Sequence, residues 1–293
     1  MRVLIATDGS KEALLAMHVA SHLLSETDRQ VDVLYVTTQP RAVPSKELVA
    51  SAYERRIVPE AFRILQEAQQ ALREEGIEAG VRYTVGSPAQ VLLQETGNYD
   101  VTVIGAKGRN VASDVGLGPV AGRLIEHASG CVLVGREFEQ ERGARILAPV
   151  DGSDGSRQAL DVLPRLFDLA SAEITLLHVV ETQWLGIEAE QGQPLEEAAG
   201  DVDEASLLVE LRREGEQVLS RARERMLECH AGITTLLREG DPANEILSEA
   251  EQGGHDLVLL GASGSADLKH RILGSVSSKV AWNASCSVLL VRG

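Results

Sequence analysis

Short apolar runs alternate with longer segments of helical periodicity along the chain. In its first half this pattern predicts five strands, near residues 2–7, 31–38, 79–85, 100–105 and 131–136. The fourth is almost continuously apolar, which is typical of a strand covered on both faces. Residues 11–24 repeat apolar positions at helical spacing (Leu14, Met17, Ala20, Leu24), and residues 46–75 are rich in helix formers. The alternation predicts a parallel α/β sheet with right-handed crossovers.

The same pattern is present twice. Residues 2–10 (RVLIATDGS) recur as residues 145–153 (RILAPVDGS), and residues 105–134 align without a gap on residues 261–290. In each copy a capping residue precedes a proline, in Ser87-Pro88 and in Asp241-Pro242, which is a strong signal for a helix start. An internal repeat of this length predicts two copies of one domain.

We expect residues 1–138 and residues 144–293 to form these domains, each with a five-stranded, mostly parallel sheet flanked by helices. The last strand of each copy, residues 131–134 and residues 288–291, is apolar. The two strands are therefore suited to pair with each other about a pseudo-twofold axis, and two ordinary buried strands are the alternative. A homodimer of two whole chains is a further alternative.

A longer acidic segment separates the second strand and second helix of copy two. Residues 186–206 contain seven Asp or Glu residues with little periodicity. This composition predicts a solvated, mobile loop, with a lid or a docking segment for a protein partner as the alternative.

The chain is acidic, and this narrows its partners. Its 293 residues carry 44 acidic and 28 basic side chains, a formal net charge of −16. Nucleic acid and anionic membranes would be repelled at long range. A small anion such as ATP is not excluded, because salt screens charge beyond about 8 Å and a local nest of backbone N–H groups still binds phosphate.

The cysteines and the apolar runs indicate a cytoplasmic protein. Cys131, Cys229 and Cys286 form no Cys-x-x-Cys pair and are odd in number, which favours reduced, buried thiols. The N-terminal apolar run is too short for a signal peptide, and no stretch reaches the ~18 apolar residues of a membrane span.

Candidate chemistry lies after the fourth strand of copy two. Gly261 and Gly264 follow that strand, and Gly274-Ser275-Val276-Ser277 opens the last helix. Glycines allow close approach of backbone amides, the helix N-terminus adds unpaired N–H groups, and the serine hydroxyls add donors. This combination predicts a phosphate cradle.

At these residues the sequence resembles the universal stress protein family in its tandem, two-domain form. The spacing Gly261-x2-Gly264-x9-Gly274-Ser275 is similar to the signature of the members that bind ATP. The resemblance covers both copies apart from the acidic segment. It implies a Rossmann-like fold similar to the nucleotide α-hydrolases, a role in stress response, and ATP as ligand, with or without Mg²⁺.

The resemblance also implies roles for residues at the ends of the first and second strands of copy two. Asp151 matches the family's acidic residue on the adenosine side, with Pro149 and Val150 beside it, and Val179 lies where the family packs adenine. Together with the glycine-rich loop, the expected nucleotide-binding residues are Pro149, Val150, Asp151, Val179, Gly261, Gly264, Gly274, Ser275, Val276 and Ser277.

Copy one keeps part of this pattern, in Thr7, Asp8, Val36, Gly105, Gly108 and Gly118. However, Pro119 replaces the counterpart of Ser275, and Ala121 replaces that of Ser277. Copy one therefore lacks two hydroxyls and one amide donor. At ~1.5 kcal/mol per hydrogen bond, this loss weakens the binding free energy by about 4 kcal/mol, or a thousandfold in affinity. We expect a weak or vacant site here, unless Lys107 and Arg109 partly replace the donors.

Other motifs are weaker. Residues 116–121 fit G-x-G-x-x-A, but they lie far beyond their strand and copy two has no equivalent. The P-loop and the S-G-G-x-D-S pyrophosphatase loop are absent from the sequence. His18 and His22 share a helix face, yet no third metal ligand is evident in the sequence. Lys269, His270 and Arg271 form either a phosphate-neutralising turn or a solvated one.

The sequence thus predicts a regulatory ATP-binding protein with its nucleotide mainly in the second domain. No pair of carboxylates, activated nucleophile or general base adjoins the cradle in sequence, so efficient catalysis is not indicated. The alternatives are a scaffold of the same fold that binds no nucleotide, and an enzyme such as a slow ATPase or a nucleotidyl transferase.

Overall fold

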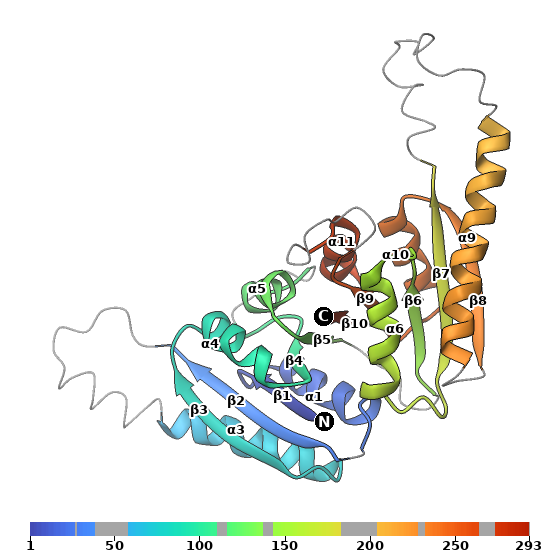
Figure 1. Cartoon of the computed structure of the whole chain (residues 1–293). Coiled ribbons are helices and arrows are strands. Elements are labelled where there is room, and N and C mark those ends of the chain that lie inside the picture. The colour runs from blue at the N-terminus through green and yellow to red at the C-terminus, as the bar shows by residue number, and fades with distance from the viewer. Residues whose placement is uncertain are drawn as a thin grey trace, which may run out of the picture.

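The computed structural model describes residues 1–26, 28–38, 58–109, 116–136, 143–182, 204–227, 232–263 and 273–292 (Figure 1). Copy one contains β1 (Arg2–Thr7), α1 (Lys11–Leu23), β2 (Gln30–Thr37), α3 (Val58–Glu74), β3 (Ala79–Val85), α4 (Pro88–Glu95), a 3₁₀ turn (Thr96–Asn98), β4 (Val101–Gly105), α5 (Pro119–His127) and β5 (Cys131–Gly135). Copy two contains β6 (Arg145–Pro149), α6 (Asp154–Leu166), β7 (Glu173–Glu181), α9 (Glu204–Leu227), β8 (Ile233–Gly240), α10 (Pro242–Gln252), β9 (Leu257–Gly261), α11 (Ser275–Asn283) and β10 (Ser287–Val291).

All ten strands lie in one sheet, in the order β3-β2-β1-β4-β5-β10-β9-β6-β7-β8. Strands of the same copy pair in parallel, whereas β5 and β10 pair antiparallel and join the two halves. The five predicted strands of copy one are confirmed to within one residue at each end. The α/β fold and the pairing of the two last strands are confirmed as well.

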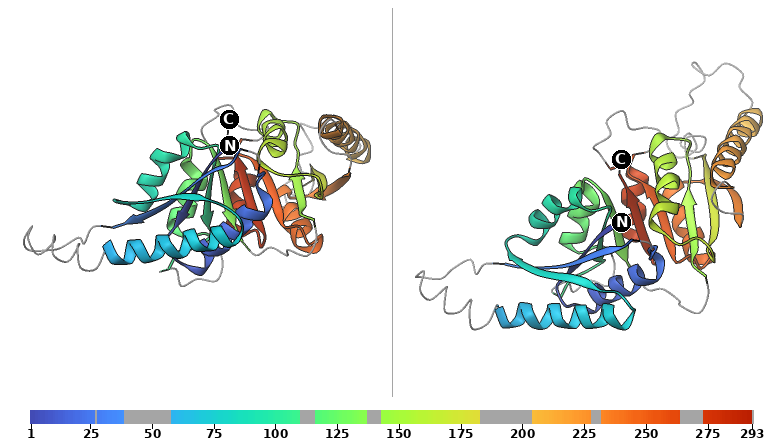
Figure 2. Two further views of the ribbon diagram at one scale, coloured as in Figure 1. Left: turned by 90° about the horizontal axis from the view of Figure 1, so that it is seen from below. Right: turned by 60° about the horizontal axis from the view of Figure 1, so that its bottom comes forward.

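Helices cover both faces of the sheet (Figure 2). Side chains of α1, α3, α6 and α9 pack with one face in a single apolar cluster that spans both copies. Side chains of α4, α5, α10 and α11 pack with the other face in a second cluster. Each strand of the sheet centre is therefore covered on both sides, which explains the continuous apolar runs in the sequence.

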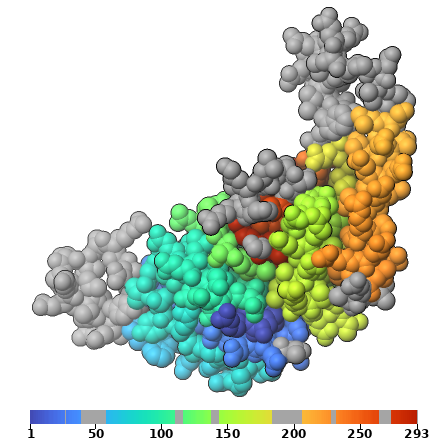
Figure 3. All heavy atoms as spheres, in the orientation of Figure 1, coloured from blue at the N-terminus to red at the C-terminus, as the bar shows by residue number. Residues whose placement is uncertain are grey.

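The junction between the copies is symmetric. Leu133 of β5 lies opposite Leu289 of β10, and both side chains are fully buried. The C-terminal residues accordingly lie where the two copies adjoin (Figure 3). Trp282 of α11 packs against α5, so that a side chain on Gly122 would begin 2.8 Å from the indole ring.

Two equivalent arginines cap helices across this junction. Arg136, after β5, donates from Nη1 to the Cys286 carbonyl at 3.0 Å and from Nη2 to the Ala281 carbonyl at 2.9 Å. Arg292, after β10, donates from Nη2 to the carbonyls of Ile125 and Glu126 at 2.6 and 2.7 Å. Each copy thus satisfies carbonyls at the C-terminal end of the last helix of the other copy.

Glycines at the ends of β4 and β9 allow close contact with the first helix of each copy. A Cβ on Gly105 would lie 2.7 Å from the backbone carbonyl of Glu12 in α1. A Cβ on Gly261 would overlap the backbone of Gly155 in α6. The first glycine of each glycine-rich loop is therefore required for helix packing, in addition to any ligand.

The structure corrects two details of the sequence interpretation. Leu14 is 38% exposed and lies beside the buried face of α1 rather than on it. For the predicted helix at residues 46–75, α3 confirms the part that the structure describes, and residues 46–57 lie outside the described residues. The acidic segment ends earlier than expected, because α9 already begins at Glu204, and its residues 186–203 lie outside the described part of the chain.

Cys131 and Cys286 are free and buried, as expected, and burial raises the pKa of both thiols, that of Cys286 to about 11. Cys229 lies outside the described residues. Across the described helices, none is long and apolar enough to cross a membrane.

The first prediction concerns Arg136. Burial lowers the pKa of Arg136 to about 10, so the guanidinium is still charged at neutral pH. Arg136→Met would leave two carbonyls of copy two without their charged donor, and we expect it to lower the free energy of unfolding by about 2–3 kcal/mol in urea denaturation. Arg63→Met, in an exposed pair with Glu67, is the control and should change it by less than about 0.5 kcal/mol. Equal effects would contradict the capping role.

The second prediction concerns Gly105. Gly105→Ala places a methyl group against helix backbone, which cannot rotate away, and should cost about 2–3 kcal/mol of unfolding free energy. In Gly97→Ala the new Cβ meets only the Ser129 hydroxyl at 3.3 Å, so this control should be nearly neutral. Thermal and urea unfolding of both variants measure the difference.

Candidate functional site

Two equivalent sites lie at the carboxyl ends of the parallel strands. In copy one, β1 lies between β2 and β4, and in copy two, β6 lies between β7 and β9. The connections that follow β1 and β4 lead to helices on opposite faces of the sheet, as do those that follow β6 and β9, so the loops diverge and open a crevice in each copy. The Asp-Gly-Ser turns and the described ends of the glycine-rich loops of both copies flank these crevices.

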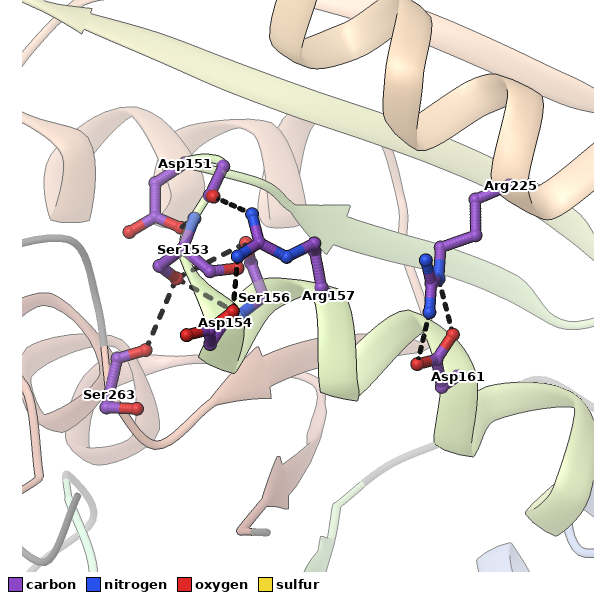
Figure 4. A network of polar contacts seen from close by, with 9 residues as sticks. Asp151, Ser153, Asp154, Ser156, Arg157, Asp161, Arg225 and Ser263 are labelled. Atoms are coloured by element: carbon purple, nitrogen blue, oxygen red, sulfur yellow. Dashed lines mark hydrogen bonds and ion pairs between the residues drawn. The ribbon is translucent and has the colours of Figure 1, made fainter.

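The Asp-Gly-Ser turn holds a carboxylate at the end of the first strand. In copy two, Asp151 Oδ1 accepts from the Ser153 amide at 2.9 Å, and Gly152 has φ +76°. Ser153 Oγ accepts from the Ser156 amide at 3.2 Å and caps α6 (Figure 4). The sequence repeats this turn in copy one, where Asp8 Oδ1 accepts from the Ser10 amide at 2.9 Å.

The N-terminus of α11 offers donors to the copy-two site. The Gly274 amide bonds to the Ala262 carbonyl at 2.8 Å, and the first intrahelical bond runs from Ser278 to Gly274. The amides of Ser275, Val276 and Ser277 are thus the N–H groups that a helix leaves without an intrahelical partner. No described side chain caps Gly274. These amides and the Ser275 hydroxyl form the positive end of the helix.

The Ser277 hydroxyl already has a partner within the protein. Its hydroxyl is buried and donates to the Gly261 carbonyl at 2.7 Å, which ties α11 to the end of β9. In this conformation the Ser277 hydroxyl proton is already used, so the hydroxyl donor for an anion is that of Ser275. The donor difference between the two copies is smaller by one than the sequence suggested.

Cavities of different size occupy the two sites. The copy-two cavity has a volume of about 450 Å³, and the copy-one cavity has about 230 Å³. Cavities that bind small molecules usually have about 300–1,000 Å³, so only the copy-two cavity falls in this range.

The structure brings together the predicted residues that it describes. The copy-two cavity is lined by Pro149, Val150, Asp151, Val179, Gly261, Gly274, Ser275, Val276 and Ser277. The copy-one cavity is lined by Thr7, Asp8, Val36, Gly105, Gly108 and Gly118. Gly264, Lys269, His270 and Arg271 lie outside the described residues.

In copy one the glycine-rich loop folds onto the aspartate. Asp8 Oδ2 accepts from the Arg109 amide at 2.9 Å, and a Cβ on Gly108 would lie 2.6 Å from the same oxygen. The Arg109 side chain pairs with Glu60 of α3 at 2.7 Å. Asp8 and Arg109 are therefore engaged with the protein.

Sequence reasoning missed two side chains near the copy-two site. His178 of β7 lines the cavity, and its Nδ1 donates to the Val150 carbonyl at 2.7 Å. Arg157 of α6 bonds to the Gly152 carbonyl and to Asp154, and so braces the Asp-Gly-Ser turn (Figure 4). In copy one, Leu14 holds the position equivalent to Arg157. An alignment of the two copies would therefore have shown that copy two has an arginine where copy one has a leucine.

Comparisons with known proteins agree with this architecture. The model of the universal stress protein family matches residues 1–136 and again residues 144–292. Universal stress protein YxiE of Bacillus subtilis is 35% identical over 154 residues, which cover 50% of this chain and 98% of that protein. A universal stress protein of Mycolicibacterium smegmatis is 25% identical over 303 residues, covering 99% of this chain and 96% of that protein.

The crystal structure of a universal stress protein from Archaeoglobus fulgidus shares the fold, with a TM-score of 0.65 and 18% identity over 99% of this chain and 98% of that one. Because the family model matches both copies and together nearly all residues, this chain belongs to the universal stress protein family and carries two of its domains in tandem.

Proposed function

We propose that this chain is a regulatory protein that binds ATP, mainly in its second copy, and that it catalyses little or no turnover. The proposal rests on one observation. The N-terminus of α11, with three amides that no intrahelical bond uses, faces the same cavity of about 450 Å³ that Asp151 and Val179 line. A helix N-terminus of this kind favours a phosphate group.

The walls of this cavity match the parts of an adenine nucleotide. Val150 and Val179 supply an apolar wall suited to the adenine ring. Asp151 lies at the strand end, where a carboxylate accepts hydrogen bonds from ribose hydroxyls or from an adenine amino group. Ser275 and the α11 amides lie at the glycine-rich end, which suits the phosphates.

The same residues argue against efficient catalysis. Among the described side chains that line the cavity, the titratable ones are Asp151, His178 and Glu181. His178 donates from Nδ1 to a backbone carbonyl, and Asp151 accepts a backbone amide. Neither contact pairs a nucleophile with a general base, as hydrolysis by a protein group would require.

The third prediction concerns Asp151. Asp151→Ala removes a charged hydrogen-bond acceptor for the adenosine side, and calorimetric titration should give a binding free energy for ATP weaker by about 1.5–3 kcal/mol. Asp8→Ala is the matched control in copy one and should leave the tight site unchanged. Unchanged binding in Asp151→Ala together with loss in Asp8→Ala would assign the tight site to copy one.

The fourth prediction concerns the asymmetry between the copies. Pro119 lacks both the amide and the hydroxyl that Ser275 supplies. At ~1.5 kcal/mol per hydrogen bond, the loss of these two donors weakens the binding free energy of copy one by about 3 kcal/mol, or more than a hundredfold in affinity. Titration of the intact chain should give close to one tight ATP. Ser275→Pro should remove that site, whereas Pro119→Ser should strengthen the weak one.

Two equal tight sites in the unmodified chain would contradict this asymmetry. No binding at any ATP concentration would favour the scaffold function. Repeated turnover of ATP to phosphate or pyrophosphate would favour an enzyme instead.

A further inference from the structure

Two histidines and a glutamate converge far from the nucleotide cavities. His18 and His22 lie on the C-terminal half of α1, and Glu75 directly follows α3. The nucleotide cavities lie at the other end of the strands, where α1 begins. The ligand atoms of His18, His22 and Glu75 (one nitrogen of each histidine and one carboxylate oxygen) all lie within 4.8 Å of one another. His18 and His22 already share a helix face in the sequence, and the fold adds Glu75 as the third group.

The distances are close to those of a coordinated metal ion. His18 Nδ1 lies 2.9 Å from Glu75 Oε1, and His22 Nε2 lies 3.7 Å from Glu75 Oε2. In a tetrahedral zinc site with bonds near 2.0–2.1 Å, neighbouring ligand atoms are about 3.3 Å apart. Small side-chain rotations therefore suffice to place one ion between the three groups.

The backbone orients two of these ligands. His22 Nδ1 lies 3.0 Å from the His18 carbonyl, which can only accept, so Nδ1 carries the proton and Nε2 has the lone pair. Glu75 is the C-cap of α3 in a Schellman motif, with bonds from Gly76 to Arg73 and from Ile77 to Leu72. Gly76 takes the required positive φ of +76°.

In copy two an ion pair joins the corresponding helices. There Asp161 of α6 holds the position equivalent to His18, and Arg225 of α9 pairs with it through both carboxylate oxygens (Figure 4). Copy one instead directs two imidazoles to a single carboxylate, a set of donors typical of zinc.

We propose that His18, His22 and Glu75 bind one divalent transition-metal ion of the zinc class, with water in the fourth position. Between a quarter and a third of each of these side chains is exposed, so an ion reaches them from solvent. Binding replaces the hydrogen bond between His18 and Glu75 and joins α1 to α3. The site therefore acts as a metal staple, that is, a metal ion that links α1 to the end of α3 in copy one. In copy two the ion pair between Asp161 and Arg225 links α6 to α9 instead.

The test uses the full-length chain, stripped of metal and free of nucleotide, titrated with Zn²⁺ by calorimetry. Unmodified protein should bind one Zn²⁺ that His22→Ala and Glu75→Gln each weaken at least tenfold. Zn²⁺ should also raise the melting temperature of the unmodified chain, because it binds the folded state, and should not raise it in the two variants.

His127→Ala is the matched control, because His127 pairs with only Glu126, at 3.6 Å, among the described residues. It should keep the unmodified affinity and the thermal shift. Circular dichroism verifies that the variants fold, and the imidazole NMR signals of His18 and His22 should move on addition of Zn²⁺. Identical Zn²⁺ binding in the unmodified chain and both site variants, or no binding in any, would overturn the proposal.

Discussion

The antiparallel contact between β5 and β10 is the constraint from which the rest of the architecture follows. It places Leu133 opposite Leu289 and turns two five-stranded halves into one sheet without an exposed central edge. The same contact brings Arg136 and Arg292 to the ends of helices in the opposite copy. The N-termini of those helices, α5 and α11, line the two candidate sites. The junction therefore holds the opposite end of each helix that contributes to a site.

On this symmetric scaffold the two candidate sites differ at a few positions. The copy-one site has Pro119 at the first helical position and a smaller cavity. In the copy-two site the Ser275 hydroxyl and one more amide face a larger cavity. The proposed metal staple follows the same logic, because His18 and Asp161 are equivalent positions that serve different chemistry. Tandem duplication allows one copy to change while the shared sheet keeps it folded.

Most of the fold could be predicted from the sequence, because the strands are short apolar runs and the repeat fixed their number. The candidate nucleotide site was predicted from residues adjacent in sequence to strand ends. Contacts between distant segments could not be. The Ser277 bond to the Gly261 carbonyl, the Arg109 amide on Asp8 and the approach of Glu75 to His18 all depend on how helices pack onto the sheet. Gly261 was assigned to phosphate alone, but its contact with Gly155 also requires a glycine.

Amide hydrogen exchange of the intact chain, with and without ATP, tests the central claim most directly, since it reports on both copies at once. If the second copy holds the nucleotide, ATP will slow exchange at residues 274–278 and 151–153 and will leave residues 118–122 nearly unchanged at concentrations that saturate one site. Equal slowing in both glycine-rich loops, or slowing confined to copy one, would contradict the account.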